Sequence, residues 1–157
     1  MKRDFTFVFI LLAILSMVNA IPYQLHKRDT TFIQCPKSDA SLLTVSVSPD
    51  PPVPGQIATY TISGELAKAA PVGSTIVIRF ADVSSGEAKV IGVPSRTDLC
   101  SKVECPASSI NIVEEVAIPA DLPYAYANSV SIIDSDNRYG CSVAVVGGNG
   151  GGAAPNA

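Results

Sequence analysis

Hydrophobic and polar residues alternate along much of the chain with the two-residue period of β-strands. In residues 75–80, for example, Ile76, Ile78 and Phe80 fall on one face. The same alternation predicts strands at residues 42–48, 57–66, 75–80, 89–93, 110–118, 124–133 and 139–146. Prolines and glycines separate these segments, and none has a helical period. The pattern therefore predicts an all-β fold, a sandwich of antiparallel sheets.

Two of these strands follow each other closely in residues 110–133, with Pro119 and Pro123 at the corner between them. We interpret them as a hairpin that follows a short loop between Cys100 and Cys105.

The second strand of this pair has one face of large side chains and one of small ones. The large face consists of Tyr124, Tyr126, Val130 and Ile132, and Asn128 interrupts it.

The chain has 157 residues, of which 47% are hydrophobic and 16% charged, so we expect a single domain with a substantial core. Residues 1–20 combine Lys2 and Arg3 with an apolar run and a small residue, Ala20, which predicts a cleaved signal peptide; a retained membrane anchor is the alternative. The glycine-rich residues 147–157 predict a disordered tail.

The dibasic pair Lys27-Arg28 leaves two interpretations open. It is either the end of a propeptide at residues 21–28 or part of a polar linker. From Asp29 onward the chain contains 7 Lys plus Arg and 13 Asp plus Glu, a net charge of −6. This charge disfavours nucleic acid and gives no electrostatic reason to bind anionic membranes.

Four cysteines behind a signal peptide predict disulfide bonds in an oxidising compartment, and four cysteines allow three pairings. We choose Cys35–Cys141, which would join the start of the domain to its last strand, and Cys100–Cys105, which would close a tight loop. The cysteine spacing does not suit a zinc site.

Candidates for catalysis are few. The one histidine, His26, precedes the predicted mature start, so histidine-assisted nucleophiles and histidine metal sites lack their essential group. Glu114 and Glu115 are adjacent on a strand, point to opposite faces and are interpreted as a solvated strand edge. Residues 134–138 begin like a calcium loop, but Arg138 stands where an oxygen ligand is needed, so we interpret them as a polar turn. We expect no enzyme activity, no metal and no cofactor.

Several short motifs occur in the order found in one family of lipid-recognition proteins. They are Cys35, the proline-rich residues 48–55, Gly64, Gly73-Ser74, Asp98-Leu99-Cys100, Cys105-Pro106, Ile118-Pro119, Tyr126, Asp134 and Cys141. Over residues 31–146 the sequence thereby resembles the ML domain. It is most similar to the fungal phosphatidylglycerol/phosphatidylinositol transfer proteins and more distantly to the Niemann-Pick sterol carrier.

The resemblance implies an immunoglobulin-like sandwich of two antiparallel sheets with a lipid cavity between them. It implies a secreted or vacuolar carrier of sterol or of phosphatidylglycerol- or phosphatidylinositol-type phospholipid, and we expect a monomer that contacts membranes transiently. The residues expected to line the cavity are Tyr60, Ile62, Ile76, Ile78, Phe80, Ile112, Tyr124, Tyr126, Val130 and Ile132. The chain lacks the third disulfide of many relatives and has Pro123-Tyr124 where they have Pro-Gly, which leaves the ligand open.

Burying a methylene contributes about 0.8 kcal/mol. A sixteen-carbon tail thus offers on the order of 13 kcal/mol against an association cost of about 4 to 15 kcal/mol. Two tails, or a rigid sterol, would be held better than one tail. The same alternation also suits a sandwich with a solid core, so the second hypothesis is a non-enzymatic recognition or adhesion module.

Overall fold

The computed structural model describes residues 30–147, which form eight strands and one short 3₁₀ helix. The elements are β1 (Ile33–Gln34), β2 (Thr44–Ser48), β3 (Ile57–Ala70), β4 (Thr75–Asp82), β5 (Lys89–Asp98), η1 (Leu99–Ser101), β6 (Ala107–Ala117), β7 (Tyr126–Ile133) and β8 (Arg138–Val146). The predicted signal peptide, propeptide and most of the predicted tail lie outside these residues. Within residues 30–147, no helix is long and apolar enough to span a membrane.

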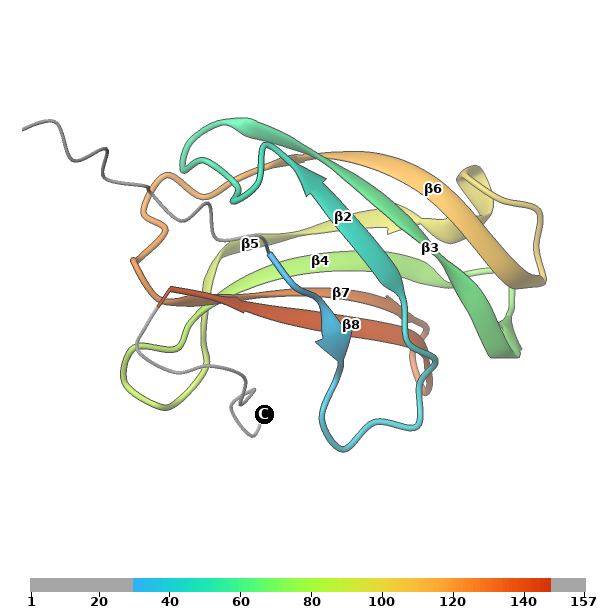
Figure 1. The fold of residues 1–157 in the computed structure, drawn as a ribbon. Helices are drawn as coiled ribbons and strands as arrows, with labels where there is room; N and C mark the ends of the chain where they lie inside the picture. Colours follow the sequence, from blue (N-terminus) through green and yellow to red (C-terminus); the bar gives the residue numbers. More distant parts are fainter. Residues whose placement is uncertain (1–29, 148–157) are drawn as a thin grey trace, which may run out of the picture.

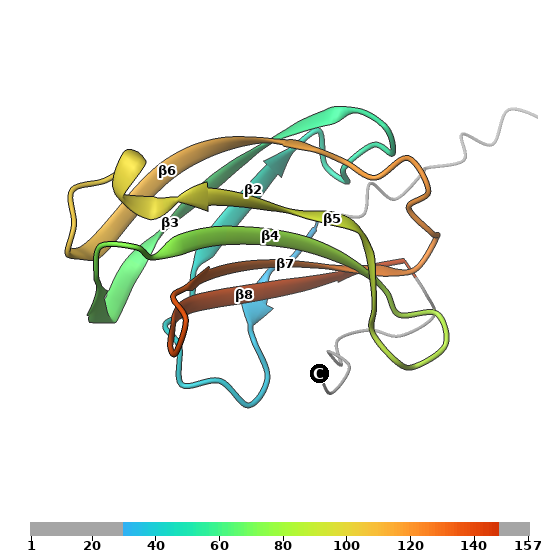
Figure 2. The ribbon, with the colours of Figure 1, turned by 180° about the vertical axis from the view of Figure 1, so that it is seen from behind.

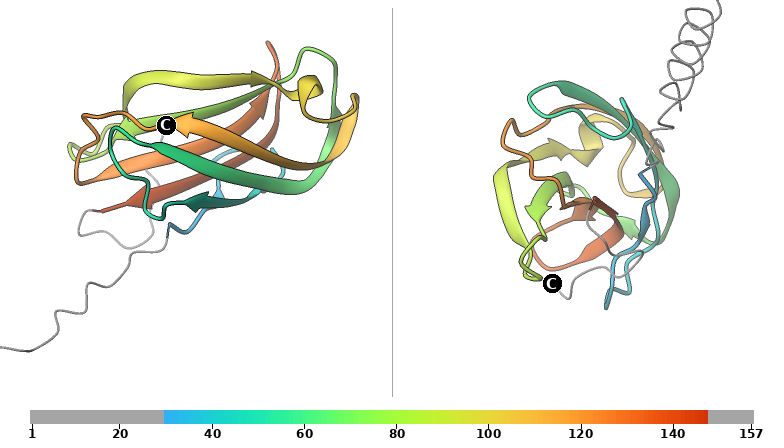
Figure 3. Two further views of the ribbon diagram at one scale, coloured as in Figure 1. Left: turned by 90° about the horizontal axis from the view of Figure 1, so that it is seen from above. Right: turned by 60° about the vertical axis from the view of Figure 1, so that its left-hand side comes forward.

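The strands form two antiparallel sheets that pack face to face (Figure 1). One sheet has the order β1-β8-β7-β4-β5 and the other has the order β2-β3-β6. Viewed from behind and from the end, the two layers enclose a common interior (Figures 2 and 3). The predicted all-β sandwich of two antiparallel sheets is confirmed.

All seven predicted strands are present, and alternation places their apolar residues inside. In β6 the side chains of Ile110, Ile112 and Val116 are buried, whereas Asn111 and Val113 between them are exposed. β5 runs on to Asp98, past the predicted end at Val93, and includes Pro94. A proline is tolerated there because β5 is an edge strand with only one neighbour.

The predicted hairpin over residues 110–133 is wrong. β6 pairs with β3, whereas β7 pairs with β4 and β8 in the other sheet. The loop that contains Pro119 and Pro123 therefore carries the chain from one sheet to the other. Strand composition alone does not distinguish a wide corner between sheets from a turn within one sheet.

The structure contains both disulfide bonds predicted from the sequence, Cys35–Cys141 and Cys100–Cys105. The first attaches β8 to the segment that follows β1, and the second closes the loop between η1 and β6. Nearby, Gly140 faces β2 and β3, and a Cβ at this position would lie 2.6 Å from the Leu43 side chain. A larger residue at position 140 would therefore force the buried Leu43 and Leu66 side chains to shift.

Candidate functional site

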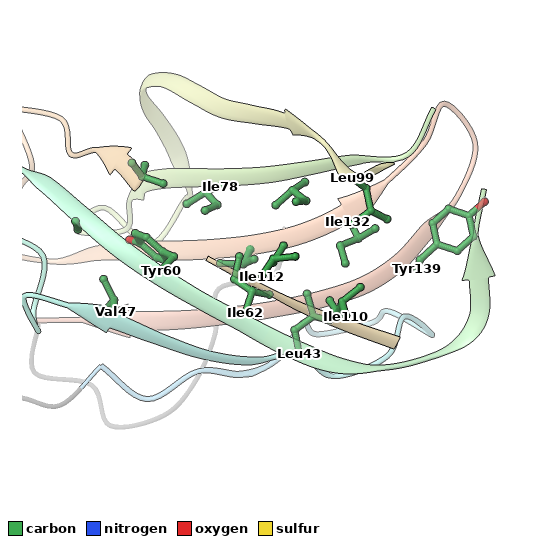
Figure 4. Packing of buried hydrophobic residues seen from close by; sticks show 14 of the residues in the cluster. Leu43, Val47, Tyr60, Ile62, Ile78, Leu99, Ile110, Ile112, Ile132 and Tyr139 are labelled. Carbon is green, nitrogen blue, oxygen red and sulfur yellow. The ribbon is translucent and has the colours of Figure 1, made fainter. Parts of the chain in front are cut away.

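The interior between the sheets brings together nine of the ten residues expected to line a lipid site. They belong to one buried cluster and are each 0–4% exposed: Tyr60, Ile62, Ile76, Ile78, Phe80, Ile112, Tyr126, Val130 and Ile132. Figure 4 shows side chains of this cluster pointing from both sheets into the same space. Ladder pairing aligns them, since Ile62 lies opposite Ile112 and Ile76 opposite Ile132.

Tyr124 does not belong to this interior, contrary to the expectation. Its side chain is 71% exposed, and β7 begins two residues later at Tyr126. The alternation that placed Tyr124 on the apolar face applies only where the strand is paired, and ladder pairing starts at Tyr126 opposite Val146.

The cluster also contains residues that the sequence analysis did not propose as lining. The main ones are Leu43, Val47, Leu66, Leu99, Ile110, Val116 and Tyr139. Leu43 and Val47 follow the same strand alternation, so that pattern could have identified them. Leu99, by contrast, lies on η1, which the two-residue period does not predict.

Three polar side chains lie at one end of this apolar interior. Asn128 is fully buried and its Nδ2 donates a hydrogen bond to the Tyr60 hydroxyl across the sandwich. Within residues 30–147, neither Asn128 Oδ1 nor the buried Tyr126 hydroxyl has a hydrogen-bond partner. A buried polar atom without a partner is costly, so these two atoms can bind a polar group of a ligand. The sequence signal was Asn128 itself, which interrupts the large face of β7.

Charge near this polar end is negative. Burial, reinforced by the Asp50 carboxylate, raises the pKa of Tyr126 to about 12, and burial also raises the pKa of Tyr60. Glu114 lies opposite Tyr60 in the β3–β6 ladder, on the same interior face. Both phenols stay neutral at physiological pH, and an anion placed here would face the Asp50 carboxylate, because Glu114 is paired with Lys102.

The two long edges of the sandwich are joined differently. At one edge Ser41, before β2, accepts a hydrogen bond from Cys141 N at 2.9 Å and donates one to Tyr139 O at 2.9 Å. Ser142 Oγ on β8 bonds the backbone of Leu43, accepting from its N–H at 3.0 Å and donating to its carbonyl oxygen. This edge is linked through the backbone.

At the opposite edge β5 pairs only with β4, and β6 only with β3, among the described strands. A side-chain ion pair lies at this edge: Lys102, the residue directly after η1 in the connection from β5 to β6, has its Nζ 3.0 Å from Oε1 of Glu114 on β6. Glu114 is 9% exposed, so the expected solvated edge is wrong for Glu114, while Glu115 is exposed. In the described part of the chain, backbone hydrogen bonds thus join the two sheets at the β2–β8 edge, whereas the β5–β6 edge is joined by this ion pair and by the chain connection through η1.

In a comparison with protein families, residues 29–146 match the family described as the ML domain. The chain belongs to the ML domain family. No curated protein matches the sequence. ML domains bind lipid ligands, and this family together with two disulfide bonds fits a protein of the secretory pathway or the extracellular space.

The remaining candidate residues of this ML domain have structural roles. Asp134 accepts hydrogen bonds from the backbone N–H groups of Asp136 and Asn137 at 2.8 and 2.6 Å, and from the Tyr139 hydroxyl. Its oxygens thereby hold the β7–β8 turn. In the described part of the chain, no three His, Cys, Asp or Glu side chains are grouped to hold a metal ion.

Proposed function

We propose that this ML domain carries a neutral lipid with a hydroxyl group, such as a sterol, between its two sheets and catalyses no reaction. The polar end of the interior is the observation that carries the proposal. It offers an acceptor, Asn128 Oδ1, and a hydroxyl on Tyr126 that can both donate and accept. A ligand hydroxyl has the same two capacities and can satisfy both atoms.

A phospholipid head group suits this end less well. A phosphate diester is anionic, and the Asp50 carboxylate acts on both Tyr60 and Tyr126. Lys102 already pairs with Glu114 beside this face. The phospholipid cargo of the fungal transfer proteins is therefore the second candidate, and a solid-core recognition module is the third.

Side chains of the cluster occupy the space between the sheets, so binding requires the sheets to separate. We place the opening at the β5–β6 edge, which one ion pair bridges, and the hinge at the β2–β8 edge, which hydrogen bonds from β8 to Ser41 and Leu43 hold. A rigid ring system suits this space because it loses little conformational entropy on burial.

The test compares a fluorescent sterol with the same sterol methylated on its hydroxyl oxygen. We expect the free sterol to bind more tightly. Tyr126→Phe should weaken sterol binding by about tenfold, since a hydrogen bond to a buried partner contributes about 1–1.5 kcal/mol.

The matched control is Tyr139→Phe, because Tyr139 lies in the same cluster but its hydroxyl bonds Asp134. This variant should bind the sterol as the wild type does. Equal binding of the two sterols would contradict the hydroxyl site. Tighter binding of phosphatidylglycerol than of sterol would favour the phospholipid candidate.

A further inference from the structure

The outer face of the five-stranded sheet has a hollow of about 360 Å³, away from the interior between the sheets. Its floor is formed by outward-facing residues of β4, β7 and β8, among them Ala127, Ser129 and Val143. The Cys35–Cys141 disulfide lies at one side of it. This volume is at the lower end of the range for small-molecule sites.

Two guanidinium groups line this hollow, from Arg79 on β4 and Arg138 on β8. Within the described residues neither makes an ion pair with a carboxylate. Ser129 and Ser131, between them on β7, add hydroxyl groups. Guanidinium groups and hydroxyl groups donate hydrogen bonds to oxyanions, and the small apolar floor suits a short hydrocarbon chain.

Charge is distributed unevenly over the two outer faces. All three arginines of residues 30–147 lie on the outer face of the five-stranded sheet. Arg79 and Arg138 line the hollow, and Arg96 lies opposite Val77, which is on the outer face of β4. The outer face of the other sheet carries Glu65 and Glu115. Asp98, opposite Thr75, lies on the same face, but the hollow itself is lined by two arginines and by no acidic residue, which favours an anionic ligand there.

We propose that this hollow binds a single-chain anionic amphiphile, a medium-chain carboxylate, with its head group between Arg79 and Arg138. The site is separate from the interior, so it does not depend on the proposed lipid cargo.

The experiment titrates the folded protein with octanoate and with octanol and follows both by NMR. We expect octanoate to shift the amide signals of Ala127, Ser129 and Ser131 and to leave the methyl signals of Ile62 and Ile78 unchanged. Octanol should bind at least tenfold more weakly, because it lacks the charge. Shifts of the interior methyl groups instead, or equal binding of the two compounds, would overturn the proposal.

Arg79→Gln and Arg138→Gln should each weaken octanoate binding by about tenfold. Arg96→Gln is the matched control, because it removes the same charge from the same face but does not line the hollow. Its effect should stay below about twofold, and all three variants should keep the thermal midpoint of the wild type. An equal loss in all three would show a general basic surface and would contradict a defined site.

Discussion

Glu114→Gln should speed lipid uptake while it lowers stability only slightly. The substitution keeps the shape of the side chain and removes the charge that holds Lys102 at the β5–β6 edge. The Lys102 side chain is 37% exposed and that of Glu114 is 10% exposed, so water screens one partner much more than the other. We therefore expect a loss of about 0.5 kcal/mol in the free energy of unfolding, within the range of surface ion pairs.

Removing the cation should cost more than neutralising the acid. Lys102→Met leaves the Glu114 carboxylate nearly buried without a counter-charge, a change that costs about 3–5 kcal/mol at fully buried sites. Because Lys102 is more than a third exposed, we expect about 1 kcal/mol. If the edge opens to admit lipid, a bias of about 0.5–1 kcal/mol toward the open state raises the uptake rate about two- to fivefold.

The assay measures the rate of extraction of a fluorescent sterol from neutral vesicles, beside urea denaturation of each variant. Glu115→Gln is the control, because it lies on the same strand and faces outward. High salt should raise the uptake rate of the wild type more than that of Glu114→Gln, because only the wild type has the Lys102–Glu114 ion pair that salt can screen. An unchanged uptake rate in Glu114→Gln, or the same acceleration in Glu115→Gln, would refute the entry edge.

Three further predictions concern covalent links, packing and pH. Thiol titration of the unfolded, unreduced protein should read near zero, and serine in place of Cys35 and Cys141 should lower the denaturant midpoint more than serine in place of Cys100 and Cys105. The chain-entropy model gives about 5 and about 2 kcal/mol for separations of 106 and 5 residues, so equal losses would contradict it. If the interior expands for lipid, Ile78→Trp should impair sterol extraction and leave the stability nearly normal. Unchanged extraction, or the loss of about 1–3 kcal/mol that overpacking causes, would favour a solid core. The Tyr139 hydroxyl and two backbone N–H groups lower the pKa of Asp134 to about 2, so its contribution to stability is present above about pH 4 and is lost as the pH falls toward 2. The thermal midpoint of Asp134→Asn should therefore fall less over that pH range than that of the wild type, and parallel curves would contradict this role.

The strands and their inner faces could be predicted from the sequence because large apolar side chains recur along the inner faces with the two-residue period. Ile76, Ile78 and Phe80 are buried as their period predicts. The partner of each strand could not be predicted in the same way. The wrong hairpin shows why. β6 and β7 have the composition of two paired strands, and the sequence does not show that the loop between them crosses from one sheet to the other.

The polar end of the interior could not be predicted from the sequence, because it depends on contacts between segments that are far apart in the chain. Asn128 is visible as an interruption of an apolar face, but its hydrogen bond to Tyr60 joins residues 68 positions apart. The ion pair at the β5–β6 edge likewise depends on η1, which no periodic pattern indicates. The prediction that Tyr124 lines the interior was wrong for a different reason. It extended the two-residue alternation beyond Tyr126, where the pairing of β7 begins.

Native mass spectrometry of the protein secreted from eukaryotic cells tests the central proposal most directly, because it detects bound lipid without a chosen probe. We predict one monomer with one neutral lipid of sterol mass, which mild activation releases intact. Lipid-free protein in repeated preparations, with no binding of added sterol or phospholipid, would contradict a carrier function for the interior.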